Sequence, residues 1–192
     1  MNIGIYIYDH AEVLDFSGPF EVFSTASRLA KNAWSVFLIS ETGSLVTARG
    51  NYQIQSHYPI SDHPDLDVLI VVGGIHTEEM KKENVISWLA KVSQTSEIVA
   101  SVCTGCFLLA EAGLLNCLSV TTHWEDIPTL KSAYPQLSVL ENQRWVRQGK
   151  YVTSGGISAG IDMSLFLVSE LASEELAKKT AKQMEYRWQP GS

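Results

Sequence analysis

Cys103 is the residue of this sequence best placed for covalent chemistry. It directly follows the apolar run 97–102, and the stretch after it, 104–112, has helical spacing. A cysteine at such a strand-to-helix turn projects above the sheet, with its backbone at the N-terminus of the next helix. The helix dipole and the free amides of Thr104 and Gly105 favour the thiolate, which is the nucleophilic form. We therefore predict an exposed, reactive thiol at Cys103; the alternative is a small buried apolar residue.

The other two cysteines are assigned to packing. Cys103 and Cys106 have the spacing of a C-x-x-C dithiol, but Cys106 falls inside the predicted helix and is expected to face the sheet. Cys117 has no partner group. The five histidines are dispersed and no second C-x-x-C is present, so four zinc ligands do not assemble from the sequence. We expect no metal and no organic cofactor.

Polar or flexible residues follow three further strands. Asp15 lies between apolar neighbours and is either a charge at a helix N-terminus or a functional acid. Gly73 and Gly74 form either a tight turn or a pair of bare amides that face a developing anion. His123 ends the strand that follows Cys103 along the chain, so the two could meet across neighbouring strand tips; the alternative is a hydrogen-bonded rim residue.

The elements that must position these residues alternate between strands and helices. Strands are predicted at 2–8, 33–39, 67–72, 97–102 and 118–122, helices at 17–29, 77–92, 104–112, 158–171 and 174–186, and hairpins around 49–51 and 148–150. The run 67–72 is continuously apolar, as in a strand covered on both faces. The pattern predicts a single domain over 1–192, a three-layer α/β/α sandwich with a mostly parallel sheet. Ligands bind such sheets beyond the carboxyl ends of the strands.

The composition argues against several classes of function. The 192 residues include 14 Lys and Arg against 21 Asp and Glu, a formal net charge of −7. No basic stripe is present to neutralise a row of phosphates, so nucleic acid is not an expected partner. The N-terminus does not have the pattern of a signal peptide, and no apolar run reaches the ~18 residues of a membrane span. We expect a cytoplasmic protein without membrane contact.

Five ordered motifs resemble the ThiJ/PfpI superfamily, which has the class I glutamine amidotransferase-like, flavodoxin-like fold. The motifs are residues 14–23, 71–74, 101–105, 121–124 and 154–162, with the sequences LDFSGPFEVF, VVGG, SVCTG, TTHW and SGGISAGID. Within the superfamily the set is most similar to isonitrile hydratases and to the amidase-like domains of AraC-type regulators. Thr104 stands where protease-like members place a histidine. Asp15 stands where redox sensors, deglycases and glyoxalases carry a glutamate.

The resemblance implies a cofactor-independent hydratase that converts a small-molecule isonitrile and water into an N-substituted formamide. Cys103 would be the nucleophile, Asp15 would supply or relay the proton, and Thr104 with the region of Gly73 and Gly74 would orient the adduct. Two anions a few ångströms apart raise each other's pKa, so the cysteine and the aspartate form one coupled pair that shares a proton. With Cys103 as thiolate, Asp15 is expected to be protonated.

Further residues are expected to bind the substrate, and the resemblance also implies a homodimer. The candidate pocket residues are Phe16, His123, Trp124, Gly156 and Ile157. The alternative function is a non-enzymatic sensor whose pocket holds a small molecule or records oxidation of Cys103. Regulators append a helix-turn-helix region, whereas this chain stops soon after Tyr186, which favours the enzyme. The substituent on the substrate and the role of Glu185 stay open.

Overall fold

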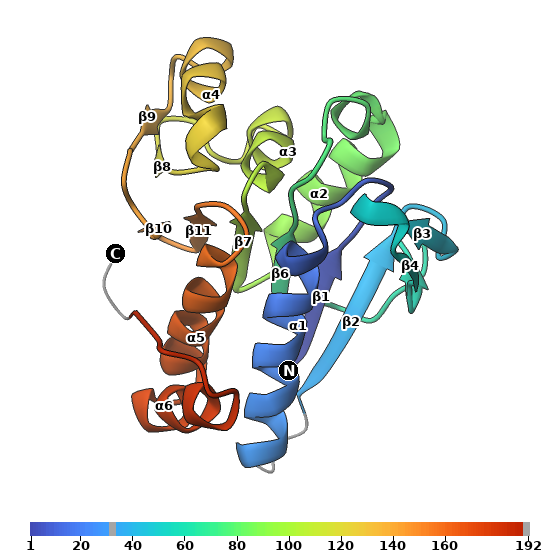
Figure 1. Cartoon of the computed structure of the whole chain (residues 1–192). Helices are drawn as coiled ribbons and strands as arrows, with labels where there is room; N and C mark the ends of the chain where they lie inside the picture. The colour runs from blue at the N-terminus through green and yellow to red at the C-terminus, as the bar shows by residue number, and fades with distance from the viewer. Residues whose placement is uncertain (31–33, 190–192) are drawn as a thin grey trace.

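The computed structural model describes residues 1–30 and 34–189, and its centre is a seven-stranded sheet (Figure 1). The strand order is β10-β11-β7-β6-β1-β2-β5. The bounds are β1 (Asn2–Tyr6), β2 (Ser35–Ser40), β5 (Tyr58–Pro59), β6 (Val68–Val71), β7 (Ile98–Val102), β10 (Trp145–Gln148) and β11 (Tyr151–Ser154). Every neighbouring pair is parallel except β10 with β11. The predicted mostly parallel sheet is confirmed.

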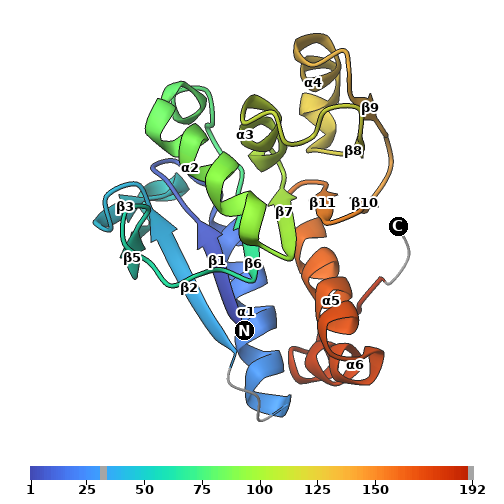
Figure 2. The same cartoon turned by 180° about the vertical axis from the view of Figure 1, so that it is seen from behind.

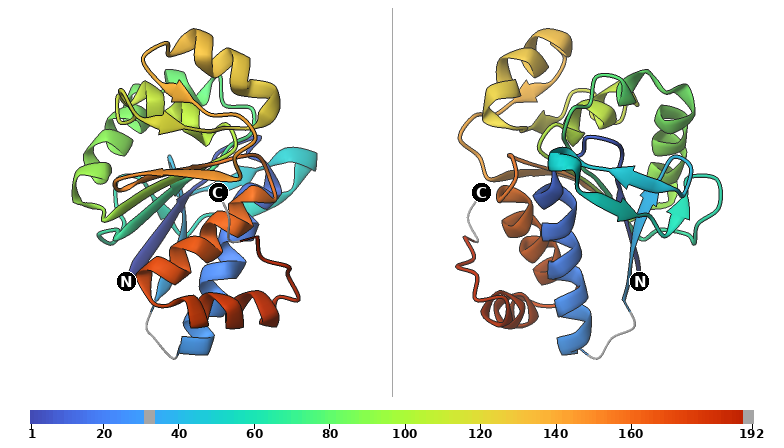
Figure 3. Two further views of the ribbon diagram at one scale, coloured as in Figure 1. Left: turned by 90° about the vertical axis from the view of Figure 1, so that its left-hand side faces the viewer. Right: turned by 45° about the vertical axis from the view of Figure 1, so that its right-hand side comes forward.

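Helices cover both faces of this sheet and complete the three layers (Figures 2 and 3). On one face α1 (Val13–Ala30) packs against α5 (Ala159–Leu171) and α6 (Glu174–Gln183). On the other face α2 (Glu83–Thr95) packs against α3 (Gly105–Glu111). Because both faces are covered, β6 and β7 are buried at every position, which explains their continuously apolar sequences. Full burial of each large aliphatic side chain in these strands contributes about 1.5–3 kcal/mol.

Smaller elements lie beyond the carboxyl ends of the strands and at the sheet margin. The predicted hairpin around 49–51 is present as β3 (Leu45–Thr47) and β4 (Gln53–Gln55), joined by the 3-10 turn η1 (Arg49–Asn51). A second 3-10 turn, η2 (Glu79–Lys81), precedes α2. The segment after α3 contains β8 (Ser119–Val120), η3 (Trp124–Asp126), α4 (Ile127–Ala133) and β9 (Ser138–Val139), at the upper left of Figure 1.

The structure corrects three of the predicted elements. The first helix begins at Val13 rather than at residue 17, so Pro19 lies inside it. An interior proline costs about 3 kcal/mol, and the buried faces of Phe16, Val22 and Phe23 offset that cost. The predicted helix 77–92 is divided into η2 and α2.

The third correction concerns the strand predicted at 118–122. Its observed part, β8, pairs in parallel with β9 in a separate two-stranded sheet, while the positions beside β7 belong to β6 and β11. The strand predicted at 33–39 is observed from Ser35; Ala33 lies outside the described residues. Across the described parts of the chain, no helix is both long enough and apolar enough to cross a bilayer.

Candidate active site

Cys103 occupies the turn between β7 and α3, as predicted, and its backbone has a left-handed φ of 57°. A non-glycine residue in this region is strained and persists only where its surroundings impose it. Its amide donates to the carbonyl of Gly155 at 3.2 Å, and its carbonyl accepts from Thr122 Oγ1 at 2.8 Å. The predicted exposure is wrong: Cys103 is only 7% exposed, whereas Cys117 is exposed. At this turn the thiol is therefore almost fully shielded from bulk solvent.

Asp15 is fully buried in the first turn of α1 and interacts with the Cys103 thiol. Burial raises the pKa of Asp15 to about 7, although the hydrogen bond from the Gly73 amide opposes the shift, as do the polar groups of Cys103 and Ile157. Burial, followed by the charge of Asp15, raises the pKa of the Cys103 thiol far above its ordinary value, against a hydrogen bond from the Thr104 amide. The predicted thiolate is therefore corrected. In the resting pair the thiol keeps its proton, and the Asp15 carboxyl, with a pKa of about 7, is present in both its protonated and charged forms at neutral pH.

The amides of Gly73 and Gly74 are already engaged, so of the two alternatives for these glycines the structure excludes bare amides that face an anion. The Gly73 amide donates to Asp15 Oδ2 at 3.0 Å, and the Gly74 amide donates to Thr104 Oγ1 at 2.9 Å. The Thr104 hydroxyl in turn donates to the Gly74 carbonyl at 3.0 Å. The two glycines thus hold the acid and the turn in place, because their donors point at protein groups rather than at open space.

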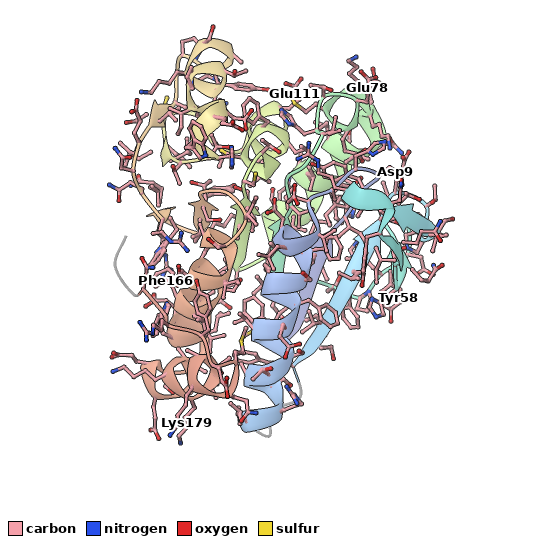
Figure 4. The ribbon with its side chains drawn as sticks, in the orientation of Figure 1. Asp9, Tyr58, Glu78, Glu111, Phe166 and Lys179 are labelled. Carbon is pink, nitrogen blue, oxygen red and sulfur yellow. The ribbon has the colours of Figure 1, made fainter. Side chains whose placement is uncertain are left out.

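A cavity of about 360 Å³ lies against Cys103. Five of the predicted site residues line it, namely Gly74, Cys103, Thr104, His123 and Ile157. Five more lining residues were missed from the sequence: Glu12, Arg49, His76, Glu125 and Asp126. Figure 4 labels Glu111, at the end of the helix α3 that follows the Cys103 turn, far from Lys179 on α6. The cavity is polar, with ionisable groups on several walls.

His123 reaches this cavity by a route other than the predicted one. Because β8 is outside the main sheet, His123 is not at the tip of a strand beside β7. Two hydrogen bonds fasten its segment instead: the Thr121 amide donates to Thr153 Oγ1 at 2.8 Å, and Thr122 donates to the carbonyl of Cys103. A Cβ on Gly156 would lie 2.1 Å from His123 Cδ2, so only glycine leaves room for the imidazole.

The remaining predicted pocket residues lie elsewhere. Phe16 is buried and its ring centroid is 6.4 Å from that of Tyr52, so it packs in the core. Trp124 is 75% exposed and, with Gly156, lines a neighbouring cavity of about 540 Å³. That larger cavity also includes Arg144, but none of its lining residues is a cysteine, so we place the candidate chemistry in the smaller one.

Some of the missed residues had weak signals in the sequence. Glu12 is three residues before Asp15, and His76 is two residues after Gly74, so both lie in segments that follow strands. Arg49 had no signal, because it comes from the hairpin; its Nη1 is 3.0 Å from Oε2 of Glu12, which also lines the cavity. Within residues 1–30 and 34–189, no group of three or more His, Cys, Asp and Glu side chains is arranged to hold a metal ion.

Comparisons with known sequences show which proteins this chain resembles. A model of the DJ-1/PfpI family matches residues 1–170. An isonitrile hydratase of Pseudomonas putida is 33% identical over 190 residues, which cover 97% of this chain and 78% of that protein. The HTH-type transcriptional regulator CdhR of Pseudomonas aeruginosa is 29% identical, and the match covers 89% of this chain and 51% of the regulator. The chain therefore spans about half the length of that relative.

Comparisons with solved structures show the same fold. A ThiJ/PfpI family protein from Pseudomonas syringae superposes with a TM-score of 0.87 at 23% identity, covering 98% of this chain and 76% of that one. Drosophila melanogaster DJ-1beta superposes with a TM-score of 0.82 at 21% identity, covering 97% and 98%. At these identities the agreement concerns the arrangement of strands and helices.

Proposed function

The chain belongs to the DJ-1/PfpI (ThiJ) family, and from that premise we propose that it is a cysteine-dependent hydratase that adds water to isonitriles without a cofactor. The observation that carries the proposal is the Cys103 and Asp15 pair, which shares one proton beside a cavity of about 360 Å³. An isonitrile needs such a pair, because its terminal carbon must gain both a nucleophile and a proton. The relative named isonitrile hydratase supports the same choice.

In the first step the thiol adds across the terminal carbon of R–N≡C. Asp15 takes the S–H proton as the sulfur bonds to carbon, and then delivers that proton to the same carbon. The product is a thioimidate, R–N=CH–S–Cys103, and Asp15 is again a carboxylate. A protonated thiol suits this step, because the proton that the substrate carbon gains is the one already bound to the Cys103 sulfur.

In the second step water adds to the thioimidate carbon. The C=N electron pair moves to nitrogen, which is protonated, and the tetrahedral intermediate then forms a C=O bond as the C–S bond breaks. Sulfur regains a proton and the N-substituted formamide leaves. The atoms of one water molecule are thereby added to the isonitrile, and Cys103 returns to its thiol form.

The surrounding residues position these steps. Gly73 orients the Asp15 carboxylate, and the Thr104 amide points its donor at the Cys103 sulfur. Gly74, His123 and Ile157 line the cavity as substrate-binding residues. Gly156 acts through His123, because its missing side chain makes room for the ring.

Substitutions at the pair test the proposal. We expect Cys103→Ala to abolish formamide production from a panel of isonitriles, because sulfur forms the covalent adduct. Asp15→Asn should lower kcat by roughly 10²–10⁴-fold, the usual loss for a general acid–base group. His123→Ala should cost less, and Cys117→Ala, an exposed cysteine, is the matched control with unchanged activity. Full activity of Asp15→Asn, or of Cys103→Ala, would remove the catalytic assignment.

A second candidate function is a sensor that binds a small molecule in the same cavity without turnover. The observation that favours it is the relation to HTH-type transcriptional regulators. Burial and a raised pKa argue against the oxidative form of this function, because thiols oxidise most readily as exposed thiolates. Saturable binding of isonitriles by the wild-type protein, with no formamide detected by mass spectrometry, would favour the sensor.

A further inference from the structure

The second half of the proposed reaction needs a base on the side from which water arrives. In the first step Asp15 acts at the carbon that bonds to the Cys103 sulfur, but it is fully buried and does not line the wall of the cavity from which water reaches the thioimidate. Of the carboxylates on the wall, Glu12 is paired with Arg49 at 3.0 Å, Asp126 Oδ2 lies 3.5 Å from His123 Nδ1, and Glu125 is largely exposed at 65%. A group on the cavity wall with an available lone pair is therefore required.

The two histidines that line the cavity, His76 and His123, contact different polar groups. His76 Nδ1 lies 3.4 Å from the carbonyl oxygen of Gly74, which can only accept, so Nδ1 carries the proton and Nε2 has the lone pair. His123 Nδ1 lies 3.4 Å from the Glu125 amide and 3.5 Å from Asp126 Oδ2, so its ring nitrogen is already engaged by neighbouring polar groups. His76 is thus the cavity histidine with a lone pair on Nε2.

The environment of His76 keeps its ring fixed and uncharged. Its centroid is 4.5 Å from that of Phe107 on α3, the helix that follows the Cys103 turn. Burial lowers the pKa of His76, although the Gly74 carbonyl and the charge of Asp126 act in the opposite direction. The imidazole is therefore neutral at pH 7. The ionisable groups that share its cavity are Glu12, Arg49, Cys103, His123, Glu125 and Asp126.

We propose that His76 is the general base that activates water in the second step, an inference that rests on the proposed function. Nε2 takes one proton from water as the oxygen bonds to the thioimidate carbon, and the imidazolium gives that proton to the substrate nitrogen. Nε2 then takes the hydroxyl proton as the C=O bond forms and the C–S bond breaks, and returns it to the departing sulfur. No oxidant, reductant or second reactant enters.

The test separates formation of the adduct from its release. In His76→Asn the amide nitrogen keeps a donor for the Gly74 carbonyl, but the Nε2 lone pair is lost. We expect the variant to form the Cys103 adduct of ethyl isonitrile at the wild-type rate and to release formamide roughly 10²–10⁴-fold more slowly. Rapid quenching and intact mass spectrometry measure both rates. His10→Asn is the matched control, because His10 is exposed and asparagine tolerates its φ of 65°.

Added hydroxylamine distinguishes loss of the base from distortion of the site. As a strong nucleophile it attacks the thioimidate without base assistance, giving R–NH–CH=N–OH and free Cys103, so it should discharge the His76→Asn adduct nearly as fast as the wild-type one. Slow discharge, slow adduct formation or wild-type release of formamide by His76→Asn would each overturn the role of His76. If the wild-type protein forms neither adduct nor formamide, the proposed function itself fails.

Discussion

At the scale of single residues, the unusual feature is a carboxyl and a thiol whose pKa values are both raised. For Asp15 the main cause is burial, which outweighs the hydrogen bond that the Gly73 amide donates to its charged form. For Cys103 the main causes are burial and the nearby carboxylate. The dipole of the following helix would lower the pKa of the thiol and favour the thiolate. Its effect is smaller than that of burial, because α3 has only seven residues and the thiol has almost no contact with water.

The Asp15 carboxyl should make the stability of the fold depend on pH. Folding raises the pKa of Asp15 from 3.8 to about 7, so the folded state binds the proton more tightly than the unfolded state. Its contribution is therefore complete below about pH 4 and is lost as the pH rises toward about 7. We expect the unfolding free energy of Asp15→Asn, relative to wild type, to increase by about 2–4 kcal/mol from pH 4 to pH 8.

Urea unfolding of both proteins across this pH range measures the effect. Other ionisable groups are common to the two proteins, so their difference isolates Asp15. Parallel stability curves would mean that the carboxyl is not perturbed by folding.

At the scale of elements, the site depends on how closely α3 begins against the end of β6. A Cβ built on Gly105 would lie 2.1 Å from the Val71 carbonyl oxygen, a backbone atom that cannot move aside alone. The absence of a side chain at Gly105 thus permits the sharp turn in which Cys103 adopts its φ of 57°. The strain at the cysteine is maintained by this packing and by the hydrogen bonds to Gly155 and Thr122.

Gly105→Ala should therefore destabilise the fold by at least about 2 kcal/mol and lower activity, because the turn must move to accept the methyl group. Gly155→Ala is the matched control: its Cβ would be 3.5 Å from the nearest atom, and we expect a change within about 1 kcal/mol. Thermal or urea unfolding compares the two. Equal stabilities of the two variants would show that the contact between α3 and β6 is not tight.

At the scale of the whole molecule, the cavity is assembled from segments far apart in the chain. Its walls come from residues near 12, 49, 74–76, 103–104, 123–126 and 157, all in loops or 3-10 turns rather than in strands or α-helices. The bridge between Ala11 and Gly74 and the bond from the Arg49 amide to the Ala11 carbonyl hold three of these segments together. Two exposed apolar residues lie nearby: Ile157, 37% exposed, lines this cavity, and Trp124, 75% exposed, lines the neighbouring one.

We expect these exposed residues to be covered in a homodimer. Tryptophan is enriched in protein interfaces because it buries a large apolar area. Light scattering at micromolar concentration should give twice the mass of one chain, and Trp124→Ala should shift the protein toward the monomer. The exposed surface substitution Lys179→Ala, at the opposite end of the molecule, is the control. A monomeric mass for the wild-type protein would refute the dimer.

Much of the fold could be predicted from the sequence because local patterns record local environments. The continuous apolar runs at β6 and β7 predicted strands covered on both faces, and the change from strand to helical spacing at Cys103 placed the turn correctly. The ordered motifs likewise led to the family that the comparisons confirm. These features depend on near neighbours in the chain, so the sequence alone determined them.

Tertiary structure decided the features that depend on distant residues. The start of α1 at Val13, the place of β8 outside the main sheet and the engagement of the Gly73 and Gly74 amides follow from packing and long-range hydrogen bonds. So does the proton on Cys103, because burial by the whole fold, rather than the adjacent helix, governs its pKa. Arg49 and His76 join the cavity for the same reason: their positions are set by strands and helices far from them in the sequence.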